Sequence, residues 1–97
     1  ANVVLSIGSR GAVLATAEGT WEVEPPRVDA VSPVGAGDAL AAALAWAMQE
    51  GHDPVESVRW GVAAGTASAM KPGLEFANRV ETEEILGRVT VRRVETL

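Results

Sequence analysis

Two glycines that precede an alanine-rich run are the residues of this sequence best suited to chemistry. Gly35-Ala36-Gly37-Asp38 follows an extended segment and leads into a run that ends near Gln49 and is rich in alanine, the strongest helix former. The first turn of a helix carries free N–H groups and the positive end of the helix dipole, and glycines let a phosphate come close to the backbone. The pattern indicates an anion site at the start of a helix.

Asp38 lies beside the position that such a phosphate would take. A carboxylate next to a phosphate is repelled unless it has a chemical task or a cation between the two. The task that fits is to accept the proton of a hydroxyl group that attacks the phosphoryl group. The plainer interpretation is that Asp38 only caps the helix and that Gly-x-Gly only forms a tight turn. These four residues alone leave both interpretations open.

Two better-known phosphate-binding motifs are excluded at this turn. The Walker A motif needs a lysine followed by serine or threonine after its glycines, and no lysine follows Gly37. The dinucleotide fingerprint needs a third glycine or an alanine where Leu40 stands.

The elements that must hold this turn in place can be predicted from apolar periodicity and from helix and strand breakers. Pro25-Pro26 ends the third strand, because proline cannot donate to a ladder. Asp53 is expected as the N-cap of the second helix, with Pro54 in its first position and Glu56 completing a capping box. Strands are predicted over 2–7, 12–16, 20–23 and 89–94, and helices over 38–50, 54–70 and 81–86.

The remaining conspicuous side chains are assigned structural roles. Trp46 and Trp60 are expected to pack between two helices, and Trp21 to lie on an exposed or interface face of its strand. The acidic run 81–84 is interpreted as a solvated helix start, since acids favour that end. No role is assigned to the loop at 75–79.

Composition limits the classes of protein to which this chain can belong. The chain has 97 residues, of which 47% are apolar, so it fits one globular domain and not a disordered segment. Its net charge of −5 disfavours nucleic acid as a partner. It has no cysteine, which excludes disulfides and thiolate metal sites and suits a cytoplasmic location. No apolar run is long enough to span a bilayer, so no membrane partner is expected.

Three blocks of the sequence resemble one enzyme family. Val34-Gly35-Ala36-Gly37-Asp38 is similar to the C-terminal signature of the ribokinase/PfkB family of carbohydrate kinases. Ser6-Ile7-Gly8-Ser9-Arg10-Gly11 resembles its nucleotide-phosphate turn, and the block 61–67 also matches. Val34 and Ala64-Gly65 favour the phosphofructokinase and tagatose-6-phosphate kinase branch. Pro33 departs from the family, which usually has threonine there.

The resemblance implies a fold and a reaction. The fold would be α/β: the C-terminal part of a ribokinase-like three-layer α/β/α fold, with an antiparallel β start followed by helices. The reaction would be ATP-dependent phosphoryl transfer to a hydroxyl of a sugar or sugar phosphate. Asp38 would be the catalytic base, and the N–H groups of Gly35, Ala36 and Gly37 would form the anion hole, each typically worth ~3 kcal/mol in the transition state.

The resemblance also implies the ligand contacts. Mg²⁺ would travel with ATP, and some members of the family hold a monovalent cation such as K⁺ through main-chain carbonyls. The residues matching the nucleotide-binding positions are Ser6, Gly8 and Gly11 for phosphates and ribose, with Val62 and Gly65 beside the adenine. Those matching the cation positions are Ser32, Val34, Ser68, Lys71 and Gly73.

Family members are considerably longer than this chain, and the chain does not begin with Met. Residues 1–97 are therefore expected to be the C-terminal ATP-binding and catalytic portion of a kinase, inactive alone and partnered by the missing N-terminal part. A homodimer remains open. So do three other interpretations: a different ribokinase-like sugar kinase, such as a ketodeoxygluconate kinase, a nucleotide-binding module without catalysis, and a plain structural domain.

Overall fold

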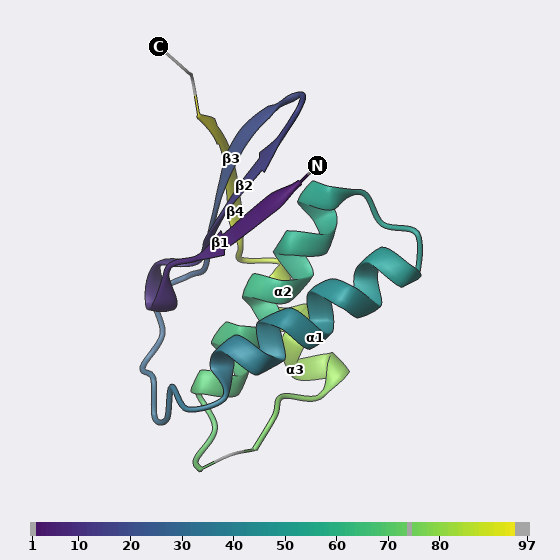
Figure 1. Ribbon diagram of the computed structural model, residues 1–97. Helices are drawn as coiled ribbons and strands as arrows, with labels where there is room; N and C mark the ends of the chain where they lie inside the picture. The colour runs from purple at the N-terminus through teal and green to yellow at the C-terminus, as the bar shows by residue number, and fades with distance from the viewer. Residues whose placement is uncertain (1, 74, 95–97) are drawn as a thin grey trace.

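In the part of the chain that the structure describes, four antiparallel strands form a sheet that supports the helices. The computed structural model describes residues 2–73 and 75–94. The sheet has the order β1-β2-β3-β4 (Figure 1). Its strands are β1 (Val3–Ser6), β2 (Ala12–Thr16), β3 (Gly19–Glu24) and β4 (Thr90–Val94). Leu14 pairs with Trp21 and Val23 with Val91, so the apolar positions of adjacent strands share one face.

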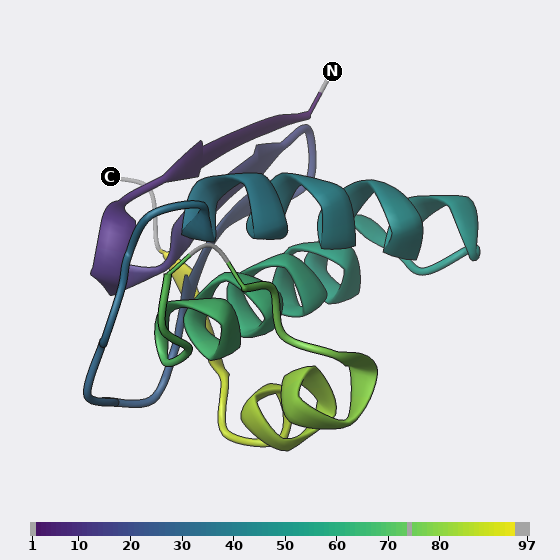
Figure 2. The ribbon, with the colours of Figure 1, turned by 90° about the horizontal axis from the view of Figure 1, so that it is seen from below.

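Three α-helices of the described residues cover that face of the sheet. They are α1 (Ala36–Gln49), α2 (Pro54–Ala69) and α3 (Arg79–Leu86), and α2 lies between the other two (Figure 2). α2 is the central helix of the layer: it is buried over most of its length and packs on β2 and β3. The core joins Leu14 and Val23 of the sheet to Val58 and Val62 of α2 and to Ile85 of α3.

Local sequence accounts for where the helices begin. The Asp53 side chain caps α2 by accepting the Glu56 N–H at 2.8 Å, as predicted. The Glu56 carboxylate pairs with Arg59 at 2.7 Å instead of reaching back to complete a capping box. A full capping box occurs at α3, where Asn78 and Glu81 exchange side-chain and backbone hydrogen bonds.

Most predicted elements are present, with shifted ends. α1 begins at Ala36, two residues earlier than predicted, because Gly35 already turns the chain. α3 begins at Arg79, two residues earlier than predicted, because Asn78 caps it. The turn at Ser9-Arg10 is a short 3₁₀ helix, η1 (Gly8–Arg10).

The three tryptophans lie in two places. Trp46 and Trp60 pack edge to face between α1 and α2, with ring centroids 5.1 Å apart, as predicted. The prediction for Trp21 is wrong: its side chain is half-buried against the core, because it shares a face with Val23. No helix among the described residues is both long enough and apolar enough to cross a membrane.

Candidate functional site

The turn before α1 is built around one glycine. Gly35 has φ 85°, a left-handed conformation that side chains disfavour, and it is the N-cap of α1. Two hydrogen bonds frame the turn: the Ala36 N–H donates to the Pro33 carbonyl at 3.2 Å, and the Ala39 N–H donates to the Gly35 carbonyl at 3.0 Å. Gly35 therefore ends the extended segment and starts the helix within a single residue.

Two amides of this turn are open. Within residues 2–73 and 75–94, neither the Gly35 N–H nor the Gly37 N–H donates to a backbone carbonyl. A Cβ placed on Gly37 would meet no heavy atom within 4 Å, so space lies beside this residue. The Ala36 N–H is the exception, because it already donates to Pro33. The turn offers open N–H groups at the positive end of a helix.

Asp38 stands one residue further on, in the first turn of α1, and is exposed. Among the described residues its carboxylate makes no ion pair and no hydrogen bond, and the cap of α1 is Gly35. It borders a cleft of about 490 Å³ between α1, α2 and the segment 76–82. The carboxylate is neither buried nor used as a cap, and it faces open space.

A larger groove lies beside the same turn. Its volume is about 930 Å³, and it runs between the η1 turn, the segment 25–30, α1 and α2. Ala36 and Gly37 line it, whereas Asp38 lines the neighbouring cleft. All five residues predicted to contact the nucleotide line this groove: Ser6, Gly8, Gly11, Val62 and Gly65.

The groove carries positive charge that sequence reasoning missed. Arg10, Arg27 and Arg88 line it, against a single carboxylate from Asp29. The whole chain has a net charge of −5, so this local excess is opposite in sign to the rest of the molecule. Arg10 could have been noticed within the Ser-x-Gly-x-x-Gly block. Arg88 could not, because it lies far away in sequence and reaches the groove only through the fold.

The glycines that line the groove differ in the structural reason for having glycine at each position. A Cβ on Gly11 would lie 2.0 Å from the Val23 carbonyl oxygen, so this residue is glycine because of strand packing. A Cβ on Gly8 would meet no heavy atom within 4 Å, although its φ is +54°. Gly65 lets α2 approach the start of α1, since its Cβ would lie 3.0 Å from the Ala36 carbonyl oxygen.

Two segments that could hold a monovalent cation lie side by side. The N–H groups of Val31 and Ser32 both donate to the Ala69 carbonyl, at 2.8 and 2.9 Å, which joins the segment before Gly35 to the C-terminal end of α2. The negative end of a helix dipole suits a cation. The residues of these two segments predicted to bind it through carbonyls are Ser32, Val34, Ser68, Lys71 and Gly73.

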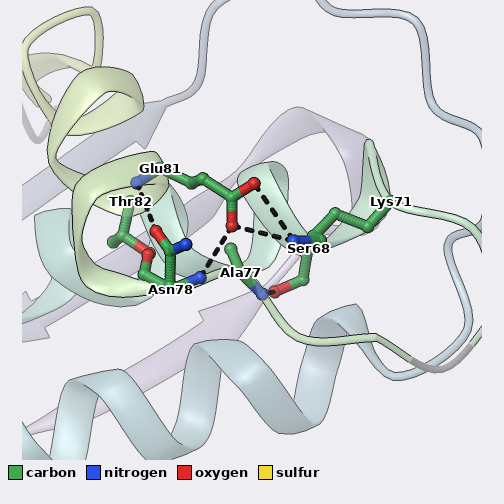
Figure 3. A network of polar contacts seen from close by, with 6 residues as sticks. All are labelled: Ser68, Lys71, Ala77, Asn78, Glu81 and Thr82. Atoms are coloured by element: carbon green, nitrogen blue, oxygen red, sulfur yellow. Dashed lines mark hydrogen bonds and ion pairs between the residues drawn. The ribbon is translucent and has the colours of Figure 1, made fainter.

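A polar network braces the second of these segments (Figure 3). Ser68 Oγ accepts the Ala77 N–H at 2.9 Å, and Lys71 Nζ donates to both carboxylate oxygens of Glu81, at 2.9 and 3.1 Å. The Asn78 N–H, and after it the Lys71 ammonium, hold the pKa of Glu81 below its ordinary value of 4.5. The acidic run was predicted to be merely solvated, but Glu81 has specific partners.

The chain is similar to known kinases over most of its length. The family described as pfkB family carbohydrate kinase matches residues 1–81. ATP-dependent 6-phosphofructokinase isozyme 2 of Mycobacterium tuberculosis (strain CDC 1551 / Oshkosh) is 43% identical over 81 residues, which make up 84% of this chain and 24% of that protein. The chain thus spans about a quarter of the length of this curated relative.

Solved structures are similar in fold as well. Phosphofructokinase-2 from Escherichia coli in complex with potassium superposes with a TM-score of 0.85 at 36% identity, over 89% of this chain and 28% of that one. Ribokinase from Thermotoga maritima gives a TM-score of 0.82 at 32% identity, over 89% and 30%. The predicted ribokinase-like α/β fold, with antiparallel strands followed by helices, is confirmed.

Proposed function

This chain belongs to the pfkB family of carbohydrate kinases, and we propose from that premise that it forms the ATP-binding and catalytic C-terminal portion of a sugar-phosphate kinase. The main support for the proposal is that the glycine turn before α1 lies between the groove and the cleft. Gly37, with an open amide, lines the groove, and Asp38, with an unpaired carboxylate, lines the adjoining cleft. A phosphoryl group moving from groove to cleft would pass this turn.

The two sides of the turn suit the two halves of a phosphoryl transfer. In the groove, ATP would place its phosphates near Gly8 and near the three arginines, Arg10, Arg27 and Arg88. In the cleft, the acceptor hydroxyl would lie against Asp38. Its oxygen forms the new bond to the γ-phosphorus and its proton passes to the carboxylate, while the bond to the β–γ bridging oxygen breaks and ADP leaves. The open amides of Gly35 and Gly37 stabilise charge on the transferred group.

The metal cofactors fit this arrangement in different ways. Mg²⁺ would be bound mainly by ATP phosphates and water, which is how this ion is usually held in kinases. A monovalent cation, proposed as K⁺, would lie between the segments 32–34 and 68–73, where the shared Ala69 carbonyl holds them together. Supporting this, a similar phosphofructokinase-2 was solved in complex with potassium.

The acceptor is proposed to be a fructose- or tagatose-type sugar phosphate. This rests on similarity to 6-phosphofructokinase isozyme 2 and to 1-phosphofructokinases. A different ribokinase-like sugar kinase is the alternative, and a substrate panel separates the two.

The surface supports a role for further protein beside this portion. Val3 and Leu5 are each 62% exposed on the outer face of β1, and the outer edge of β1 pairs with no other described strand. Ala41, Ala45 and Met48 form an exposed apolar stripe on α1. We propose that the N-terminal part of the same kinase covers these surfaces and completes the sugar site. A homodimer is the competing occupant.

The test is Asp38→Asn in the complete kinase polypeptide. We expect kcat to fall about 10²- to 10⁴-fold, the usual contribution of a general base, while ATP still raises the melting temperature. Glu50→Gln is the matched control, because it removes one carboxylate from the other end of α1. Unchanged kcat in Asp38→Asn would reject the base. ATP binding without turnover in the wild type would favour a non-catalytic module, and no ATP-induced stabilisation a structural domain.

A further inference from the structure

Residues 71–73 and 75–78 lie between α2 and α3 in the chain, and Phe76 of this segment lines the same cleft as Asp38. The Phe76 side chain lies beside the glycine turn: a Cβ placed on Gly35 would lie 3.6 Å from Cε1 of Phe76. Phe76 is 58% exposed, so its position is not fixed by burial in the core. What holds the segment therefore also holds one wall of the proposed catalytic turn.

Two polar ties hold this segment, one at each end (Figure 3). At the Phe76 end, the neighbouring Ala77 N–H donates to Ser68 Oγ of α2, and Ser68 is buried. At the other end, Lys71 Nζ reaches across to both oxygens of the Glu81 carboxylate. Glu81 belongs to α3, so the ion pair joins the beginning of the segment to the helix that follows it.

The Glu81 side chain is well placed for this task because a second contact fixes it. One carboxylate oxygen also accepts the Asn78 N–H at 2.9 Å as part of the capping box. The Glu81 side chain is 41% exposed and that of Lys71 25% exposed, so the pair lies at the surface but is partly shielded. A carboxylate bound by both a backbone N–H and an ammonium group has little rotational freedom left.

We propose that Glu81 is a positioning residue for the glycine turn: by holding Lys71 while capping α3, it keeps Phe76 beside Gly35. The inference rests on the proposed function, because it assigns Glu81 to the turn beside Asp38. Gly35 has a left-handed backbone conformation, and its open amide would bind the transferred phosphoryl group. Phe76 lies on one side of this residue. Releasing the segment would leave that side of Gly35 without its neighbour and loosen the geometry of the amides.

The variant Glu81→Gln separates the two tasks of this side chain. Glutamine retains a carbonyl oxygen that accepts the Asn78 N–H, so α3 stays capped, but it loses the charge that holds Lys71. Glu84→Gln is the matched control: it removes the same charge from an exposed position of the same helix. Both are made in the complete kinase polypeptide, with Lys71→Gln and the double variant Lys71→Gln/Glu81→Gln to close a double-mutant cycle.

Hydrogen exchange measured by mass spectrometry gives the first readout. In Glu81→Gln we expect faster exchange in peptides covering 71–78, where the Ala77 N–H is tied to Ser68, and covering 33–39, where the amides of Ala36 and Ala39 are hydrogen-bonded. The second readout is kinetic: kcat falls about three- to thirtyfold while the KM for ATP changes less than about twofold, because a shifted turn impairs transfer more than nucleotide binding.

Each outcome decides the proposal. It is overturned if exchange over 33–39 in Glu81→Gln matches that in Glu84→Gln, or if kcat is unchanged in an active enzyme. It is also overturned if the effects of Lys71→Gln and Glu81→Gln add in the double variant, because two residues acting through one contact should not be additive. If the wild-type polypeptide has no kinase activity, the proposed function fails, while exchange over 33–39 still shows whether Glu81 holds the turn.

Discussion

Gly65 of α2 faces the carbonyl oxygen of Ala36 in the first turn of α1, so closely that a Cβ on Gly65 would lie 3.0 Å from that oxygen. One helical turn away, a Cβ on Gly61 would lie at the same distance, 3.0 Å, from the Leu40 carbonyl oxygen. The absence of side chains at these two positions of α2 sets how close the helices can come. Of these two close approaches, only that of Gly65 to Ala36 lies beside the glycine turn.

Gly65→Ala should therefore impair catalysis more than Gly61→Ala does. Both substitutions push on α1 to a similar extent, and both gain helix propensity of up to about 1 kcal/mol, so their effects on the free energy of unfolding should be similar. Only Gly65→Ala displaces the start of α1, and we expect it to lower kcat/KM about tenfold or more. Chemical denaturation and steady-state kinetics on both variants check this. Equal losses of kcat/KM would contradict it.

Gly37→Ala should leave the fold intact and weaken the enzyme. Its new methyl group meets no heavy atom within 4 Å, so the free energy of unfolding should hold or rise by up to about 1 kcal/mol. The methyl group would stand where a phosphate approaches the open amide, and we expect the affinity for ATP or kcat to drop about tenfold. Gly87→Ala, whose nearest neighbour is 3.8 Å away, is the control. Full activity in Gly37→Ala would show that the Gly37 amide does not contribute to ATP binding or to catalysis.

Asp53→Ala should cost stability without affecting catalysis. The Asp53 side chain accepts the Glu56 N–H at 2.8 Å, and losing such a cap costs about 1 kcal/mol. Asp53→Asn keeps a capping oxygen and should recover most of that loss. Urea unfolding curves of the three proteins measure the difference. If alanine and asparagine are equally destabilising, the charge of Asp53 matters more than its hydrogen bond.

Glu81 should contribute to stability in a pH-dependent manner. The Asn78 N–H, and then the Lys71 ammonium, lower the pKa of this carboxyl in the folded protein. A lowered folded pKa means that the contribution is fully present above the unfolded value of 4.5 and is lost as the pH falls through the folded value. The difference in melting temperature between wild type and Glu81→Gln should thus shrink below pH 4.5. A difference that grows on acidification would reverse the assigned sign.

Local sequence was enough to predict the elements and the position of the turn. A short apolar run with β-branched residues marked β1 and alternation marked β3, Pro25-Pro26 marked the end of β3, and Asp53-Pro54 marked the start of α2. The five residues predicted to contact nucleotide do line one groove. Resemblance to a family supplied those residues, because glycine spacing alone also fits a tight turn.

Contacts between distant parts of the chain could not be predicted in the same way. Arg88 reaches the groove only because α3 and β4 return to the sheet. Lys71 and Glu81 are ten residues apart, with Lys71 just beyond the end of α2 and Glu81 in α3, so no single periodicity relates the two side chains. Trp21 was misplaced because a strand flanked by turns gives no sign of which face the helices will cover.

The two edge strands of the sheet differ in charge, and this difference affects how readily the isolated polypeptide would aggregate. β4 carries the cationic pair Arg92-Arg93, which discourages another strand from adding to it, whereas β1 reads Val3-Val4-Leu5-Ser6 and has no charge at all. Expressed without a covering partner, β1 is a template for intermolecular strand addition and hence for aggregation. The substitution Leu5→Lys would place a charge on this edge strand and oppose strand addition. It should keep the isolated portion in solution at concentrations where the wild-type portion precipitates.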